Sequence, residues 1–521
     1  MMSTKNTYDL LRYPSDTIYD WFLHIHYNTY HILKWQLPIY DILRYAEEGK
    51  VSRIMISAPP QHGKTELLVN TFISYYMVNN PNDKIIVTAY SESRATKYGS
   101  RIRDIIKEFG KDTLKKPVMK QDYQRKTNFL FDSPYEGELL AAGAHGAIMG
   151  NPANLILIDD PIKEIKDARS PTLQEDLKDW YDTSIDTRIR KRYRKNKKAL
   201  PPIIIVVAQR LDVRDLQGIL LEKEPNIDGK EALHILENGG TIPDDTWVYM
   251  NFPALSEGET EDILGRPKDT PLWSKHKNYE DLLADRRRRG TQRFNMIMQG
   301  HPTLETSYRF KHEWFYDSPD YNDENLTCLV PYSEYNKLLP TGRFWDLAAH
   351  KKKKKTQRKS QTDYYSGVLA SKDYTTDYLY ILHHERSRRD VTAVNKVIRT
   401  CLKLDGMNTF AFMELEPGSM PLLFVDTLQQ QFPGYNIMSY HPREDKMYRS
   451  YELKRLAENH CIKFVVHEGQ DISWVHTFIK ELEDFDGEDS NPNKDKHDDI
   501  VDSGGSAANY FKMNKNLYVP Y

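Results

Sequence analysis

Cysteine and long apolar runs are both scarce in this sequence. Only three cysteines (Cys328, Cys401 and Cys461) occur among the 521 residues, and they show no metal-ligand spacing. This pattern argues against a disulfide framework and against structural zinc, and it favours a reducing compartment. No run of about 18 apolar residues occurs anywhere in the sequence. The first residues lead into polar and aromatic sequence and show no apolar core of a signal peptide. We therefore expect a cytosolic protein that does not engage a membrane.

The chain also lacks an excess of charge of either sign. The 73 Lys and Arg residues nearly balance the 75 Asp and Glu residues, for a net charge of −2. A uniformly basic nucleic-acid coat is thereby excluded, so any DNA contact must come from local patches. Three basic runs are candidates, and each is equally compatible with a solvated helix face or loop. They are Arg188 to Lys198, Arg286 to Arg289, and Lys351 to Lys355.

Apolar segments alternate with helical patterns in the first part of the chain. At 521 residues the chain exceeds the size of a single core, so two or more domains are expected. Continuous aliphatic runs predict buried parallel strands, and the alternation predicts a doubly wound α/β sheet. The predicted strands are Ser52 to Ser57, Lys84 to Ala89, Leu155 to Ile158 and Ile203 to Ala208, and the predicted helices are Lys64 to Tyr76 and Glu92 to Phe109.

A phosphate-binding loop follows the first predicted strand and opens the next helix. It reads Ala58-Pro59-Pro60-Gln61-His62-Gly63-Lys64-Thr65, with Ala58 in place of the first glycine of the usual motif. Its main-chain amides can bind phosphate, Lys64 can reach the β and γ oxygens of ATP, and Thr65 can bind Mg²⁺. We expect Gln61, His62 and Gly63 to line the same site. A strand–turn–helix without nucleotide is the alternative.

Two further polar strand ends complete a hydrolysis site. Asp159 and Asp160 end the strand that starts at Leu155, where one carboxylate would hold Mg²⁺ and the other would orient the attacking water. Gln209 follows the strand Ile203 to Ala208 and could sense the γ-phosphate. The alternative is a carboxylate pair that only starts a turn.

A second α/β pattern begins after residue 340. Asp346 and Glu414 end predicted strands, and Asp498 and Asp499 begin a predicted helix. Carboxylates from several strand tips suit a two-metal phosphodiesterase, in which two Mg²⁺ or Mn²⁺ ions lie about 3.5–4 Å apart. The alternative is that these carboxylates only face solvent.

The order of the motifs resembles the large terminase subunit of tailed bacteriophages. In the first half, the resemblance rests on Pro59 to Glu66, Gly150 to Pro161 and Ala208-Gln209-Arg210. In the second half, three segments resemble that family's nuclease motifs in order, and Asp363 fits its accessory acidic strand. These segments are Phe344 to Asp346, Met413 to Ser419 and His497 to Asp502.

The resemblance implies a two-domain packaging enzyme. Residues 1–307 would form a P-loop ASCE-type ATPase domain with a mainly parallel sheet, in which residues from about 215 to 307 are a smaller linker subdomain. Residues 308–339 would be the interdomain linker, and residues 340–521 an RNase H-like nuclease domain with a mixed sheet. ATP hydrolysis would drive double-stranded DNA through the portal into the procapsid, and the nuclease would cut concatemeric DNA at the initiation and termination of packaging.

The same resemblance implies partners and a place of action. These are double-stranded DNA, the portal protein and the small terminase subunit, with a homo-pentamer on the portal during packaging. The enzyme would work in the host cytoplasm, dock transiently on the procapsid and be absent from the mature virion.

The resemblance also assigns roles to single residues. Lys64 and Thr65 would bind ATP and Mg²⁺, with Asp159 as the Walker-B carboxylate. Asp160 stands where much of the family has Glu, and Ala208 stands where the coupling motif usually has Thr. In the nuclease, Asp346, Asp363, Glu414, Asp498 and Asp499 would hold the metal ions.

Two residues extend the nucleotide site. Gln36 lies upstream of the loop, where related motors read adenine, although a lone glutamine is also compatible with an ordinary surface position. Arg94, Arg101 and Arg103 share one predicted helix, and any of them could reach the γ-phosphate of a neighbouring subunit. Arg101 is the preferred trans-acting arginine.

Two other classes of function remain open. A cellular helicase or repair nuclease could use the same parts, but it would usually show a second RecA-like domain. A non-catalytic docking protein with a degenerate motor is compatible with Ala58, Asp160 and Ala208. The basic run Lys351 to Lys355 follows Asp346 and could contact DNA phosphates beside the cutting site, or form only a surface loop.

Overall fold

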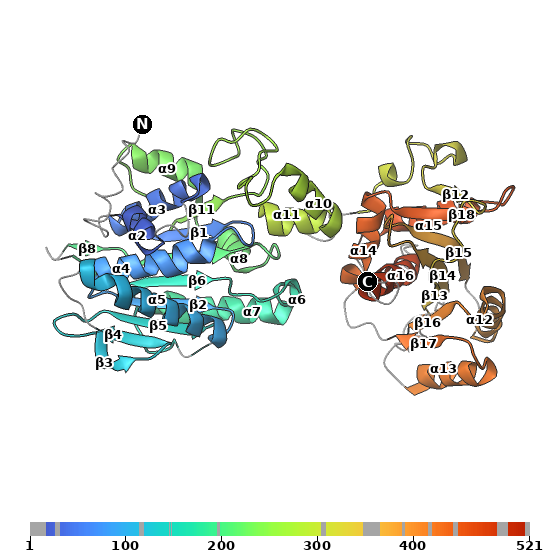
Figure 1. Ribbon diagram of the computed structural model, residues 1–521, viewed down its shortest axis with the longest axis horizontal. Coiled ribbons are helices and arrows are strands. Elements are labelled where there is room, and N and C mark those ends of the chain that lie inside the picture. The colour runs from blue at the N-terminus through green and yellow to red at the C-terminus, as the bar shows by residue number, and fades with distance from the viewer. Residues whose placement is uncertain are drawn as a thin grey trace, which may run out of the picture. The chain divides into compact units, whose positions relative to one another are not determined.

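The chain forms two compact units in a computed structural model (Figure 1). The first unit comprises residues 1–286 and 292–303, and the second comprises residues 287–291 and 304–521. The structure describes residues 17–26, 32–113, 119–144, 146, 148–194, 198–303, 309–346, 365–387, 391–414, 419–440, 446–486 and 499–515.

A nine-stranded sheet forms the centre of the first unit (Figure 1). Its order is β10-β11-β1-β9-β6-β2-β5-β4-β3, and all pairs are parallel except β3–β4 and β4–β5. One strand, β9, separates β1 from β6, which is the arrangement expected of an ASCE-type ATPase. The strands are β1 Arg53–Ser57, β2 Lys84–Ala89, β3 Met119–Gln124, β4 Asn128–Phe131, β5 Glu138–Gly143, β6 Leu155–Asp159, β9 Ile203–Ala208, β10 Asn226–Asp228 and β11 Trp247–Asn251.

Helices cover both faces of this sheet, so its central strands are wholly buried. Every residue of β6 and β9 is buried, which explains their continuous aliphatic sequences. One face packs on α2 to α5 and the other on α7 and α8. The helices are α2 Ile18–Ile25, α3 Leu37–Glu47, α4 Ile73–Asn79, α5 Glu92–Thr113, α6 Ile165–Arg169, α7 Pro171–Trp180, α8 Leu216–Lys223, α9 Gly229–Glu237, α10 Tyr279–Arg289 and α11 Thr291–Gln299.

The helix predicted from Lys64 to Tyr76 differs from a regular α-helix. A π-helical stretch, Glu66–Phe72, leads into α4. Such wide turns are rare and occur frequently at functional sites. This one directly follows the predicted phosphate loop.

The second unit contains a seven-stranded mixed sheet. Its order is β12-β18-β15-β14-β13-β16-β17, in which β13, β14 and β15 are antiparallel while β16 and β17 run parallel to β13. This is an RNase H-like arrangement, so the predicted fold of both halves is confirmed. The strands are β12 Leu329–Pro331, β13 Thr341–Asp346, β14 Tyr365–Lys372, β15 Leu379–Ser387, β16 Phe410–Glu414, β17 Ile437–Tyr440 and β18 Ile462–Val466.

Two helical layers enclose this second sheet. Side chains of α14, α15 and α16 pack on the face that carries Phe344 and Phe412. Side chains of α12 and α13 pack on the opposite face, around Trp345 and Met413. The helices are α12 Val391–Asp405, α13 Ser419–Gln431, α14 Lys446–Glu458, α15 Ser473–Asp484 and α16 Asp499–Met513. None of the helices in the described ranges is long and apolar enough to span a bilayer.

Two segments are more deeply packed than their composition suggests. Trp314, Phe315 and Tyr316, from the stretch predicted as interdomain linker, are buried in the core of the second unit. Arg192, from the first basic run, is 0% exposed and donates to the carbonyl oxygens of Ala46 and Pro201, each at 2.6 Å. This arginine therefore has a structural role.

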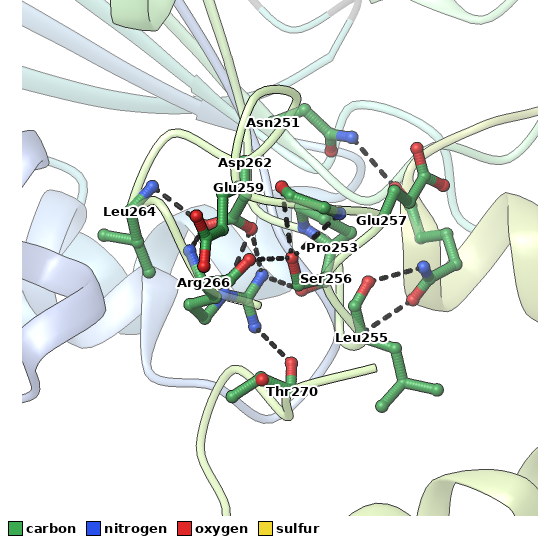
Figure 2. A network of polar contacts seen from close by, with 12 residues as sticks. Asn251, Pro253, Leu255, Ser256, Glu257, Glu259, Asp262, Leu264, Arg266 and Thr270 are labelled. Atoms are coloured by element: carbon green, nitrogen blue, oxygen red, sulfur yellow. Dashed lines mark hydrogen bonds and ion pairs between the residues drawn. The ribbon is translucent and has the colours of Figure 1, made fainter. Parts of the chain in front are cut away.

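A polar network holds the irregular segment that follows β11 (Figure 2). Asp262 pairs with Arg266 at 2.6 Å and also accepts from the Leu264 main-chain amide at 2.9 Å. Arg266 donates in turn to the carbonyl oxygens of Pro253, at 2.8 Å, and Thr270, at 3.0 Å. The Asp262 side chain is wholly buried, so the pair substitutes for regular secondary structure.

Removal of Asp262 should leave Arg266 buried without its counter-charge. We expect Asp262→Ala to lower the free energy of unfolding of the first unit by about 3–5 kcal/mol. Chemical denaturation followed by tryptophan fluorescence measures this loss. Asp245→Ala removes an exposed carboxylate from the same unit and should change stability little, so equal losses in the two variants would contradict the structural role.

Candidate functional site

The predicted phosphate loop forms a tight turn between β1 and the following helix. Gln61 and Gly63 have positive φ angles of 62° and 84°, a backbone conformation that favours glycine. The Lys64 ammonium group is buried and donates to the carbonyl oxygen of Ala58 at 2.9 Å. Lys64 thus lies across the loop, next to the place where a phosphate would bind.

The two predicted magnesium ligands of this unit lie together. The Thr65 hydroxyl donates to Asp159 Oδ2 at 3.2 Å, and the Tyr98 hydroxyl donates to the same oxygen. Asp159 is 0% exposed. Among the described residues, no group donates a hydrogen bond to its buried Oδ1 atom. A divalent cation bound beside Thr65 would satisfy that oxygen, so these residues fit Mg²⁺.

Asp160, the residue after the end of β6, has a different backbone conformation and different partners from Asp159. Its φ angle is 43°, and its Oδ1 atom accepts from the Gln209 main-chain amide at 3.1 Å. The predicted water-orienting carboxylate is therefore joined directly to the end of β9. Arg210, the next residue, forms a buried pair with Asp215 at 2.9 Å, which anchors the chain beyond this link.

The three arginines of α5 have different environments. Arg94 Nη2 lies 3.7 Å from both Asp159 Oδ2 and Asp160 Oδ2. Arg103 donates to the Gln124 carbonyl oxygen at 3.2 Å, whereas Arg101 is exposed. Sequence reasoning missed the contact of Arg94 with its own subunit's carboxylates, and it missed Tyr98 entirely. Their four-residue spacing on one helix face was the available signal.

Gln36 lies against the phosphate loop in the first unit. Its side chain is 3% exposed and accepts from the Leu33 main-chain amide at 3.0 Å. A Cβ atom at Gly63 would lie 3.5 Å from the Gln36 amide nitrogen. The alternative of an ordinary surface residue is therefore wrong.

His62 lies in an aromatic cluster that supports the loop. Its ring is 6.1 Å from the Trp273 ring and 5.3 Å from the His276 ring, between centroids. Its Nδ1 atom lies 2.9 Å from the Pro60 carbonyl oxygen. Burial lowers the pKa of His62 to about 4, so the ring is neutral near pH 7 and can donate from Nδ1.

The predicted nuclease carboxylates of β13 and β16 are direct neighbours. Asp346 and Glu414 are opposite each other in the parallel register, at the ends of their strands. Ser506 donates to Glu414 Oε2 at 3.3 Å, and Arg449 donates to Glu414 Oε1 at 2.7 Å. Burial raises the pKa of Glu414, while Arg449 opposes this rise.

The start of α16 presents two carboxylates with different partners. Asp499 Oδ2 lies 3.7 Å from Arg386. Asp502, one turn later, lies 3.1 Å from Arg449, which also binds Glu414. Asp502 was missed as a site residue, although its three-residue spacing from Asp499 places both on one helix face.

Other predicted nuclease residues lie outside the described residues. These are Asp363, Asp498 and the basic run Lys351 to Lys355. Within the described ranges, no group of three or more His, Cys, Asp or Glu side chains is arranged to hold a metal ion. Arg449 instead bridges Glu414 and Asp502. These carboxylates have the hard oxygen donors that Mg²⁺ and Mn²⁺ prefer, so the donor chemistry fits.

The first unit combines a mainly parallel sheet with a phosphate loop, as in the P-loop fold, and is joined in one chain to a unit with an RNase H-like fold. Residues 55–191 match the family model described as terminase large subunit, T4likevirus-type, N-terminal. This part of the chain is therefore similar to the N-terminal part of the large terminase subunit. No curated protein shows significant similarity to the sequence.

Several solved structures are similar to the chain at low identity. A large terminase from a thermophilic bacteriophage is 11% identical with a TM-score of 0.42, over 94% of this chain and 100% of that one. The HK97 bacteriophage large terminase is 13% identical with a TM-score of 0.35, over 92% and 95%. The large terminase nuclease from thermophilic phage G20c is 17% identical with a TM-score of 0.23, over 33% and 82%.

Asp159→Asn should reveal the cost of burying the Asp159 charge. Burial, followed by the charge of Asp160, raises the pKa of Asp159 to about 6. Because the unfolded value is about 3.9, this carboxyl loses folding stability as pH rises from about 4 to 6 and stays unfavourable above. We expect Asp159→Asn to raise the Tm of the nucleotide-free protein at about pH 7.5, with roughly half that gain at about pH 5. Calorimetry that gives equal gains at both pH values would contradict this.

Arg449→Gln should leave Glu414 and Asp502 without their shared cation. We expect a loss of about 3–5 kcal/mol in the stability of the second unit. Added Mn²⁺ should restore more stability in the variant than in the parent, because the ion replaces the lost positive charge. Thermal melts with and without Mn²⁺ measure both effects. Lys396→Gln removes an exposed charge from the same unit and should behave like the parent.

Proposed function

We propose that this chain is a viral DNA-packaging motor with two chemistries. ATP hydrolysis in the first unit drives double-stranded DNA through the portal into the procapsid. The second unit is a two-metal endonuclease that cuts concatemeric DNA when packaging starts and ends. The observation that carries the proposal is the contact between the Thr65 hydroxyl and Asp159 Oδ2, at 3.2 Å. Lys64 lies across the adjoining phosphate loop, where it donates to the Ala58 carbonyl oxygen.

In the first unit each residue near Thr65 and Asp159 has a distinct role. Lys64 and the loop amides, including those of Gln61, His62 and Gly63, bind the phosphates of ATP. Thr65 and Asp159 would hold Mg²⁺, which would neutralise the charge developing on the phosphates. Asp160 orients the attacking water and accepts its proton. Gln36, beside Gly63, reads the adenine ring.

Coupling to DNA movement starts at Asp160. Its Oδ1 atom accepts a hydrogen bond from the Gln209 main-chain amide. A movement of Asp160 when the γ-phosphate is cleaved would therefore act directly on the end of β9. Arg94 lies 3.7 Å from both carboxylates of its own subunit and balances their charge. Arg101 is exposed on α5 and is our choice for the arginine that reaches a neighbouring subunit.

In the second unit Asp346 and Glu414 hold the metal ions from adjacent strands. Asp363, Asp498 and Asp499 are the other proposed ligands, and the position of Asp502 adds it to this set. Two Mg²⁺ or Mn²⁺ ions, if held by these carboxylates, would supply an activated water and stabilise the leaving 3′ oxygen. Ser506 and Arg449 fix the Glu414 carboxylate, and Arg449 balances its charge.

The biological setting follows from the same proposal. The partners are the portal protein, the small terminase subunit and four further copies of this chain in a pentamer on the portal. The enzyme acts in the host cytoplasm, transiently on the procapsid, and is absent from the mature virion. The intact arrangement of Lys64, Thr65 and Asp159 disfavours a degenerate docking protein.

Reciprocal substitutions separate the two chemistries. We expect Lys64→Ala to reduce ATP turnover by at least about 100-fold while Mn²⁺-dependent plasmid cleavage persists. Asp346→Ala should abolish cleavage while ATP turnover persists. Phosphate release and gel electrophoresis measure the two activities, and circular dichroism monitors folding. ATP turnover unchanged in Lys64→Ala would refute the motor, and cleavage surviving in Asp346→Ala would remove Asp346 from the nuclease site.

A further inference from the structure

A cavity of about 280 Å³ lies beside Glu414 in the second unit. Its walls come from β13, β16, β17 and α16, and they include Phe412, Met438, Asn509 and Tyr510. Glu414 belongs both to this wall and to the proposed metal site. The cavity is therefore continuous with the place where a DNA phosphate would be cut.

The walls of this cavity are largely aromatic. The rings of Phe344 and Phe412 are stacked, with centroids 4.8 Å apart and an interplanar angle of 7°. The Tyr510 ring lies 4.2 Å from the Phe412 ring. Phe344 and Phe412 are buried and cover each other's faces, so the partly exposed Tyr510 ring is the surface on which a planar heterocycle can stack. Such stacking tolerates any base because every base has a π-face.

Two methionines at the cavity remain open to solvent. Met438, opposite Phe412 in the β16–β17 register, is 40% exposed, and Met513 of α16 is 80% exposed. The core does not require apolar side chains at such exposed positions. Their flexible, polarizable thioethers suit contact with a ligand.

Polar groups interrupt the apolar wall at a few points. Asn509 donates from Nδ2 to the carbonyl oxygens of Arg449, at 2.7 Å, and Gly505, at 2.9 Å. These bonds fix its side chain and leave the amide oxygen as an acceptor. An apolar cavity with a few fixed polar groups is typical of a small-ligand site.

We propose that this cavity receives one unstacked nucleobase of the DNA strand that is cut. Phe412 and Glu414 are two residues apart on one face of β16, a spacing of about 6.6 Å. A nucleotide whose phosphate lies at the metal site can therefore extend its base toward the ring of Phe412. The volume is just below the range of roughly 300–1,000 Å³ for drug-sized ligands, which suits a single base. The inference rests on the proposed nuclease function.

Binding of an unstacked base would make cleavage depend on the local structure of the DNA. Withdrawing a base from a duplex costs least where it is mismatched or unpaired. The nuclease should therefore favour locally distorted DNA over perfectly paired DNA, without reading a particular sequence.

The test uses the full-length chain with Asp346→Asn, which keeps the DNA intact. A short duplex carries 2-aminopurine at a single mismatch, and a matched duplex carries it in a normal pair. We expect protein binding to quench the fluorescence at the mismatch through stacking. We also expect about tenfold tighter binding of the mismatched duplex.

Substitutions at the rim test whether the cavity causes this preference. Adding Met438→Glu or Met513→Glu places a carboxylate at the rim from two different elements, and both should abolish the mismatch preference. Leu404→Glu is the matched control, because Leu404 is 80% exposed on α12 and does not line the cavity; it should keep the preference. A preference absent from the parent, or surviving both rim substitutions, overturns the proposal, as would a cavity that instead holds a partner's apolar segment.

A separate assay distinguishes this inference from the nuclease assignment. Mn²⁺-dependent plasmid cleavage is measured with the unmodified chain. Cleavage without a mismatch preference overturns the cavity proposal alone. A mismatch preference without cleavage supports the cavity and overturns the nuclease assignment.

Discussion

The structure depends on balancing negative charge that is buried at the ends of parallel strands. A carboxylate removed from water is unfavourable unless a cation or several hydrogen-bond donors accompany it. Both units meet this constraint with an arginine from a neighbouring helix. Arg94 of α5 lies near Asp159 and Asp160, and Arg449 of α14 joins Glu414 to Asp502. In both units, positive charge therefore reaches the carboxylates from a helix beside the sheet.

The sequence was sufficient to predict both sheets and the main strand ends. Continuous aliphatic runs correspond to β6 and β9, which are wholly buried, because a sheet covered on both faces needs apolar residues at every position. Thr65 and Asp159 lie together as expected, since parallel strands bring their carboxyl ends to one edge. Asp346 and Glu414 are neighbours for the same reason.

Other features depend on side chains that meet only in three dimensions. Apart from the four-residue spacing between Arg94 and Tyr98, the sequence does not distinguish Arg94, which faces its own carboxylates, from the exposed Arg101 on the same helix. Asp502 shares Arg449 with Glu414 only because its position on α16 faces that arginine. Arg192 lies in a basic run typical of a surface, yet main-chain carbonyl groups enclose it. Charge composition describes none of these environments.

The bond between Asp160 and residue 209 has an evolutionary consequence. Its donor is the main-chain amide of Gln209 and not the glutamine side chain. Every amino acid except proline offers the same donor. The hydrogen bond can therefore persist when residue 209 is substituted. Variation at this position among related proteins would not by itself indicate that the coupling between Asp160 and β9 is lost.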